Sequence, residues 1–209
     1  MLINFNEIKD ILSRNNINIT GAFHVGAFEC EELSFYDILN LRNEDVLWID
    51  ANETKVNEAR SRGIPNVYQA LITDTDDKME KFNITNNGMS SSVLELGTHA
   101  VEHPHVFYVN HVNLTSVTID TFFKRNNINP SKYNFWNFDI QGAELMALKG
   151  ATSSLHYVKA LYLEVNEKEL YLKCGLINEI DEFLNKYNFK RVLTNITQHG
   201  WGDALYIRN

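Results

Sequence analysis

Few cysteines, no long apolar run and a shortage of basic charge exclude several classes of protein. The 209 residues include two cysteines, Cys30 and Cys174, which can form at most one bridge and provide no disulfide framework. No apolar run approaches the roughly 18 residues that a membrane-spanning helix needs. The 19 Lys and Arg residues against 27 Asp and Glu give a net charge of -8, which argues against a phosphate-backbone partner. We therefore expect no nucleic-acid partner and no membrane association.

The amino-terminal segment lacks the features of a secretory leader. Residues 1–14 carry charges inside their apolar pattern and no small-residue cleavage site follows. Hydrophobic residues make up 44% of the chain and charged residues 22%, as in ordinary globular proteins. We therefore expect one domain spanning residues 1–209, located in the cytoplasm, and the sequence leaves its oligomeric state open.

The first third of the chain alternates short apolar runs with helical patterns. The runs at 21–27, 46–50 and 66–73 predict strands, and the segments between them, 29–39 and 54–60, predict helices. This alternation is the signature of a parallel sheet with right-handed crossover connections.

The rest of the chain predicts more strands around a long polar excursion. Residues 74–113 form the excursion, which we expect to be a lid over the site because loops of that length are usually functional. A helix capped by Asp120 should follow it. Further strands are predicted at 114–119, 135–138, 158–165, 189–193 and 204–207, and the last two should form an antiparallel hairpin. We therefore predict an α/β fold with a mostly parallel seven-stranded sheet, helices on both faces and a C-terminal antiparallel hairpin.

Two acids follow apolar strands and mark a candidate site. Asp139 lies between the strand 135–138 and a helix-forming series, so it should lie at the carboxyl edge of the sheet, where ligands bind in open α/β folds. Gly26 follows the first strand, and Asp50 ends the second, a position suited to hydrogen-bonding the ribose of a nucleoside cofactor. A purely structural turn is the alternative. Because the first turn has only one glycine, an NAD-type oxidoreductase is disfavoured.

Five segments together resemble a known family. HVGAFECEE, LWIDAN, TSVTIDTF, FDIQGAELMALKGA and LYLEVNEKELY are similar, in order, to motifs of the FkbM-type S-adenosylmethionine-dependent methyltransferases. The similarity runs from about Gly21 to Arg208, and its specific part is the D-x-Q-G-A-E-x-x-x-L-K-G segment. His24 stands where the family usually has an acid, Phe28 where it usually has Asn, and Asn137 where a lysine is common.

The resemblance implies a Rossmann-like class I methyltransferase fold, S-adenosyl-L-methionine as cofactor, and a set of contacts to it. The first loop would lie along the methionine part, Asp50 would take the ribose hydroxyls, and Asp139 would lie near the sulfonium. The full cofactor-binding set that we expect is His24, Gly26, Ala27, Glu29, Asp50, Ala51, Ala70, Leu71, Ser92 and Asp139.

The expected reaction is methyl transfer to an oxygen of a sugar, glycan or small metabolite. A hydroxyl acceptor needs a base, and the candidates are Asp139, Glu164 and His103. Each has a structural alternative. Asp139 would cap the following helix, Glu164 would be a solvated strand end, and His103 would pack within the lid. His99 and His103 have helical spacing but no firm third ligand, so we expect no metal site. A cofactor-binding module of the same fold without activity is the alternative function.

Overall fold

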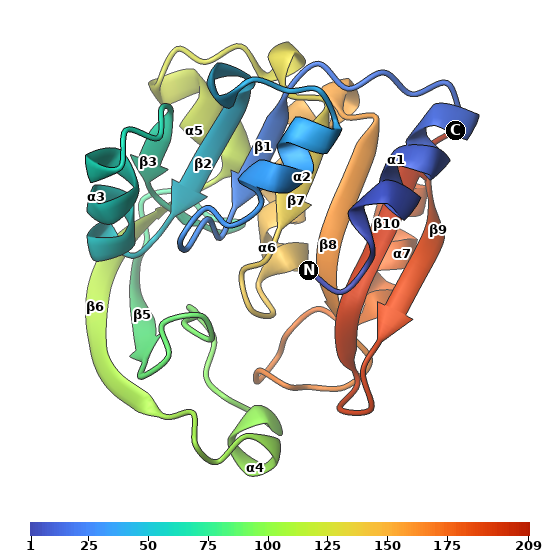
Figure 1. Cartoon of the computed structure of the whole chain (residues 1–209). Coiled ribbons are helices and arrows are strands. Elements are labelled where there is room, and N and C mark those ends of the chain that lie inside the picture. Colours follow the sequence, from blue (N-terminus) through green and yellow to red (C-terminus); the bar gives the residue numbers. More distant parts are fainter.

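The computed structural model describes residues 1–209, and its centre is a seven-stranded sheet in the order β3-β2-β1-β7-β8-β10-β9 (Figure 1). The strands β3, β2, β1, β7 and β8 run parallel, whereas β10 is antiparallel to both β8 and β9. Their bounds are β1 Ala22–Val25, β2 Val46–Asp50, β3 Val67–Gln69, β7 Phe135–Phe138, β8 Ala160–Asn166, β9 Phe189–Ile196 and β10 Trp201–Arg208. The predicted sheet and C-terminal hairpin are confirmed.

Helices cover both faces of this sheet, as predicted. One buried cluster joins the sheet to α1 (Phe5–Arg14), α2 (Leu33–Ile38) and α3 (Glu53–Ser61). A second cluster joins the opposite face to α5 (Ile119–Arg125), α6 (Glu144–Lys149) and α7 (Ile177–Asn185). Successive strand residues point to opposite faces, so Ala22 of β1 lies in the first cluster and Phe23 in the second. None of these helices has the length and apolar character needed to cross a membrane.

The 74–113 excursion and its flanks form a second, three-stranded sheet in the order β4-β6-β5. The strands are β4 Leu71–Ile72, β5 Met79–Thr85 and β6 Tyr108–Val117, and the short helix α4 spans His99–Glu102. Figure 1 shows this sheet and α4 beyond the carboxyl ends of the parallel strands, so the excursion projects as an arm over that edge. The single strand predicted at 66–73 is wrong, because the chain leaves the main sheet at Ala70 and pairs with β6.

Two helix starts also differ from prediction. The helix expected at 29–39 begins only at Leu33, because Phe28 and Cys30 adopt left-handed backbone angles (φ 40° and 55°) that a right-handed helix excludes. The predicted cap of α5 is also wrong. Thr118, and not Asp120, caps this helix, because its side chain accepts from the backbone amide of Thr121. Asp120 lies within the first turn instead, and its carboxylate accepts from the backbone amides of Ser153 and Ser154.

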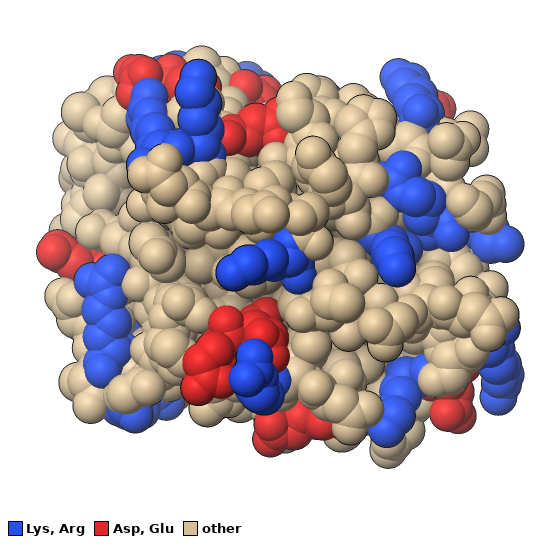
Figure 2. Space-filling model, turned by 90° about the horizontal axis from the view of Figure 1, so that it is seen from above, with Lys and Arg blue, Asp and Glu red and all other residues tan.

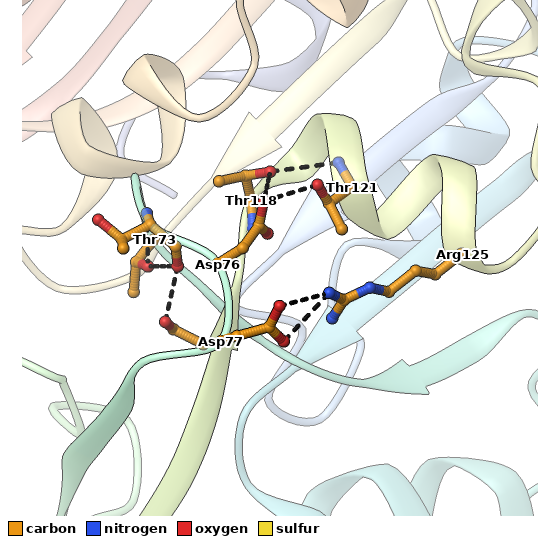
Figure 3. Close-up of polar contacts among 8 residues, drawn as sticks. Thr73, Asp76, Asp77, Thr118, Thr121 and Arg125 are labelled. Carbon is orange, nitrogen blue, oxygen red and sulfur yellow. Dashed lines mark hydrogen bonds and ion pairs between the residues drawn. The ribbon is translucent and has the colours of Figure 1, made fainter.

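The root of the arm is fastened to α5 by acidic side chains (Figure 3). The Asp76 carboxylate accepts from the Thr118 backbone amide and the Thr121 hydroxyl, each over 2.7 Å. Asp77 forms an ion pair with Arg125 of α5. The arm therefore leaves the main sheet at a fixed angle even though much of its length is exposed.

Candidate functional site

A cavity of about 350 Å³ opens at the carboxyl edge of the parallel strands, beneath the arm. Its volume lies within the range typical of small-molecule sites. Six carboxyl side chains line it, and no Lys or Arg does: Glu31, Glu32, Asp50, Asp139, Glu164 and Asp203. The cavity is therefore acidic, although the imidazoles of His99, His103 and His105 also line it.

The ends of β1 and β7 approach each other closely at the floor of the cavity. Gly26 has φ +89°, and a Cβ atom added there would lie 1.8 Å from the backbone oxygen of Asp139. Only glycine fits this crossing. The sequence suggested that Gly26 lets the backbone approach a ligand. In the structure, glycine is required at this position because the loop after β1 touches the loop after β7.

Asp50 is held in place by the backbone. Its two carboxylate oxygens accept from the amides of Phe28 and Asn52, each over 2.7 Å. Burial raises the pKa of Asp50, and these two amide bonds oppose the rise. Since each oxygen has a second lone pair, the carboxylate lining the cavity can still accept from a ligand hydroxyl.

Gln141 connects the two carboxyl groups at the cavity floor. Its amide nitrogen donates to Asp139 over 2.6 Å and also to Glu164 of β8. The Tyr171 hydroxyl donates to its amide oxygen over 2.6 Å. Gln141 reaches both carboxyls because its backbone is left-handed (φ 56°), which turns the loop after β7 back toward β8.

Glu144 holds the loop of residues 139–142 through hydrogen bonds to its backbone. This fully buried side chain accepts from the amides of Ile140 and Gly142, at 2.9 and 3.3 Å. Burial raises the pKa of Glu144 to about 8. Glu144 is not among the residues that line the cavity, so it positions the Asp139–Gln141 loop and does not touch a ligand.

Burial is the main cause of the altered pKa values among the cavity acids. It raises the pKa of Glu164 well above its usual range, and the charge of the neighbouring Asp139 adds to the rise. Burial likewise raises the pKa of Glu32 to about 7 and that of Asp203 above its ordinary value. These effects favour the protonated form of Glu164.

Most of the residues predicted from the sequence line this cavity. They are Gly26, Ala27, Asp50, Ala51, Ala70, Leu71, His103, Asp139 and Glu164. Three predicted cofactor ligands lie outside its wall. Glu29 forms an ion pair with Lys55 at 2.8 Å, and the Ser92 hydroxyl donates to the backbone oxygen of Gln141 over 2.9 Å.

His24 is the third of these residues. In β1 it points to the face covered by α1 and α2, because it alternates with the residues on the other face. Its ring stacks on Trp48 and its Nδ1 lies 2.9 Å from the Tyr36 hydroxyl. Burial lowers the pKa of His24 to about 4, so the ring is neutral beneath the cavity.

Sequence reasoning missed several residues of the cavity wall. Gln141 was visible only as part of a motif, and its role depends on a left-handed backbone that no pattern signals. Tyr171 lies in an irregular segment after β8, although it is the last residue of the LYLEVNEKELY run. Asp203 lies opposite Glu164 in the β8–β10 pairing and was assigned to a structural hairpin. An acid inside an otherwise apolar strand is the signal that could have identified it.

Comparison with known proteins identifies the family of the chain. A family model described as the methyltransferase FkbM domain matches residues 21–191. No curated protein matches the chain. Among solved structures, magnesium protoporphyrin IX methyltransferase from Synechocystis PCC 6803 with bound SAM is similar at 10% identity and a TM-score of 0.45, covering 98% of this chain and 78% of that one. A SAM-dependent methyltransferase from Aquifex aeolicus is similar at 11% identity and a TM-score of 0.38, covering 99% and 100%.

Proposed function

Because the chain belongs to the FkbM methyltransferase family, whose methyl donor is S-adenosyl-L-methionine, we propose that it methylates a hydroxyl oxygen of a sugar or small metabolite. The observation that carries the proposal is the Asp139–Gln141–Glu164 group on the floor of an acidic cavity. One end of that cavity is bounded by the Asp50 carboxylate, and the arm with its histidines bounds the other.

The residues at the sheet edge fit the donor. Asp50 would take the ribose hydroxyls, since its oxygens face the cavity and keep free lone pairs. The Gly26–Ala27 loop and Asp139 would hold the methionine part, and Ala51, Ala70 and Leu71 would pack near the base. Ser92 and Glu29 would act on this site indirectly, through Gln141 and Lys55. His24 would support the floor from the buried side.

Bound S-adenosyl-L-methionine supplies an electrophilic methyl group on a positively charged sulfonium. The acidic wall favours a cation in this position, and partly exposed Asp139 and buried Glu164 lie at the floor. Positioning of the acceptor oxygen in line with that methyl group accounts for much of the rate of methyl transfer.

A hydroxyl acceptor must also lose a proton. Burial and the charge of Asp139 raise the pKa of Glu164 well above its usual range, so Glu164 is a poor proton acceptor. We therefore assign the proton-accepting role to Asp139, with Gln141 fixing the direction of its carboxylate. His103 lies on the arm side of the cavity, where it would contact the acceptor.

The charge of the cavity supports a neutral acceptor. Phosphate and carboxylate groups are usually bound by Arg or Lys, and neither lines this cavity. A sugar hydroxyl needs no such partner. The proposal therefore favours an unphosphorylated glycan or polyol over a sugar phosphate.

The outer surface supports the absence of a nucleic-acid partner. Figure 2 views the face at the amino ends of the parallel strands, where Lys and Arg form separate groups divided by uncharged surface, with acids beside several of them. A continuous basic patch, which a phosphate backbone requires, is not visible on that face. Organisation as a single domain and a cytoplasmic location stay predictions.

Calorimetric titration of the folded protein with S-adenosylhomocysteine tests the proposal first. No measurable binding would overturn it. The second step is incubation with S-adenosylmethionine and paired acceptors, each neutral sugar beside its phosphate, followed by mass spectrometry. Methylation of the neutral members supports the proposed acceptor class, and methylation of the phosphates alone overturns it. Binding without turnover on any acceptor would favour the inactive binding module.

A further inference from the structure

A cluster of histidines lies where the arm meets the turn between β9 and β10. His103 directly follows α4, and its ring centroid lies 4.9 Å from that of His199 in the turn. Glu102, the last residue of α4, approaches His199 as well, with 3.3 Å between Oε2 and Nδ1. One ligand atom from each of these three side chains lies within 4.8 Å of the other two.

These distances suit a tetrahedral metal ion. Metal–nitrogen and metal–oxygen bonds of roughly 2.0–2.1 Å place neighbouring ligand atoms about 3.3 Å apart. The Glu102–His199 pair already has this spacing. One ring nitrogen of His103 lies within 4.8 Å of both of these ligand atoms, so it would have to move closer to complete the set.

Glu102 gives a second, independent indication. Its Oε2 atom is buried and no hydrogen-bond donor is aligned with it, although a buried carboxylate oxygen without a partner is costly. The other oxygen accepts from the Lys168 ammonium. Glu102 can therefore keep its lysine on Oε1 while Oε2 binds a cation.

The surroundings of His199 are also suited to ligation. Its Nε2 lies 3.3 Å from the side-chain amide of Gln198. A metal-bound imidazole commonly hydrogen-bonds through its second nitrogen, and that bond orients the ring. Gln198 can provide it by presenting its amide oxygen, since the two ends of the amide are interchangeable by rotation.

We propose that Glu102, His103 and His199 bind a divalent transition metal ion of the zinc type. Two imidazoles and one carboxylate leave a fourth position open to water. The ion joins α4 to the β9–β10 turn and so fixes the arm across the cavity mouth, which His103 lines. The site is separate from the proposed methyl transfer, and it makes His103 a metal ligand instead of an acceptor contact.

Zn²⁺ titration of tag-free protein by calorimetry, with Co²⁺ absorption in the visible as a report on coordination, tests the proposal. We expect one ion per chain and a tetrahedral Co²⁺ spectrum. His103→Ala and His199→Ala should each weaken the affinity by at least about 100-fold. His111→Ala, an exposed histidine on β6 of the same arm, is the matched control and should not change it.

Lys168→Met provides a test in the opposite direction. The methionine keeps a stem to pack against Gly200 but removes a positive charge beside Glu102 that would repel a metal ion. Its affinity for Zn²⁺ should rise above that of the unmodified chain. No ion bound, or equal loss in the His111 control, overturns the proposal, as does a Lys168→Met variant with weaker binding. Each readout is independent of methyl transfer, so failure here leaves the proposed function intact.

Discussion

The Tyr171 hydroxyl donates to the side-chain oxygen of Gln141 over 2.6 Å, and this bond sets which way the Gln141 amide faces. With its oxygen occupied, the amide must present its nitrogen to Asp139 and Glu164. One donor thereby joins the two acidic side chains. In the proposed reaction Tyr171 would act through Gln141, as a positioning residue.

Tyr171→Phe should lower kcat with little change in the KM for the cofactor. Without the hydroxyl, the Gln141 amide can rotate and present its oxygen to Asp139. The lost bond is worth about 1 kcal/mol, or about fivefold in kcat. Steady-state kinetics check this, with Tyr157→Phe, which lies on the surface, as the control. An unchanged kcat would mean that the orientation of Gln141 has no role.

Asp50→Ala should weaken the binding of S-adenosylhomocysteine by on the order of 2 kcal/mol, about 30-fold. The variant removes the proposed ribose acceptor and also frees the amides of Phe28 and Asn52. Calorimetry gives the affinity, and Asp37→Ala on the exposed side of α2 is the control. Equal affinities would mean that the ribose assignment is wrong.

The main sheet could be predicted because its strands are continuous apolar runs buried on both faces. Phe135–Phe138, for example, is buried at every position. The arm could not be predicted in the same way. Only the end of β6 was predicted, within 114–119; residues 108–113 are almost all exposed and carry no hydrophobic pattern that distinguishes a strand from a loop.

For the candidate site, the sequence indicated the strand-end acids but not what joins them. Asp50 and Asp139 follow apolar runs, so their place at the sheet edge followed from topology. Gln141 and Asp203 depend on a left-handed residue and on pairing between strands far apart in the chain. His24 was expected to bind the cofactor because of its place in a motif, but it lies outside the cavity wall. A motif places a residue near the site, whereas its position in β1 decides which face of the sheet its side chain points to.

Asp76→Asn should destabilise the root of the arm. Partial burial opposes ionisation of this carboxyl, but hydrogen bonds from Thr118 and Thr121 outweigh it and hold its pKa below the usual value. Because the folded pKa is depressed, the stabilisation is present above the unfolded value of about 3.9 and is lost as pH falls through the folded value.

The expected loss is about 1–2 kcal/mol in the free energy of unfolding at pH 7. Urea denaturation measures it, and the difference from the unmodified chain should shrink in acid. Asp74→Asn is the matched control, since this neighbouring acid is exposed and accepts only from Thr75. A loss of the same size in both variants would mean that the bonds drawn in Figure 3 do not hold the arm.

Glu144→Gln should flatten the dependence of stability on pH. Burial raises the pKa of Glu144 to about 8, so the folded chain binds more protons than the unfolded chain between the unfolded value of about 4.3 and that pH. Stability therefore falls as pH rises through this window, by up to about 1.4 kcal/mol per pH unit for one carboxyl. The amide oxygen of Gln can still accept from Ile140 and Gly142, so the variant should fold.

Urea denaturation at several pH values, without cofactor, measures this slope. The decline between neutral and mildly alkaline pH should be shallower in Glu144→Gln than in the unmodified chain. Glu7→Gln is the control, because Glu7 also lies in a first helical turn but is exposed. Parallel slopes for Glu144→Gln and the unmodified chain would show that Glu144 is charged when folded. A buried, charged Glu144 would then need a cation beside it, and its hydrogen bonds to the Ile140 and Gly142 amides provide none.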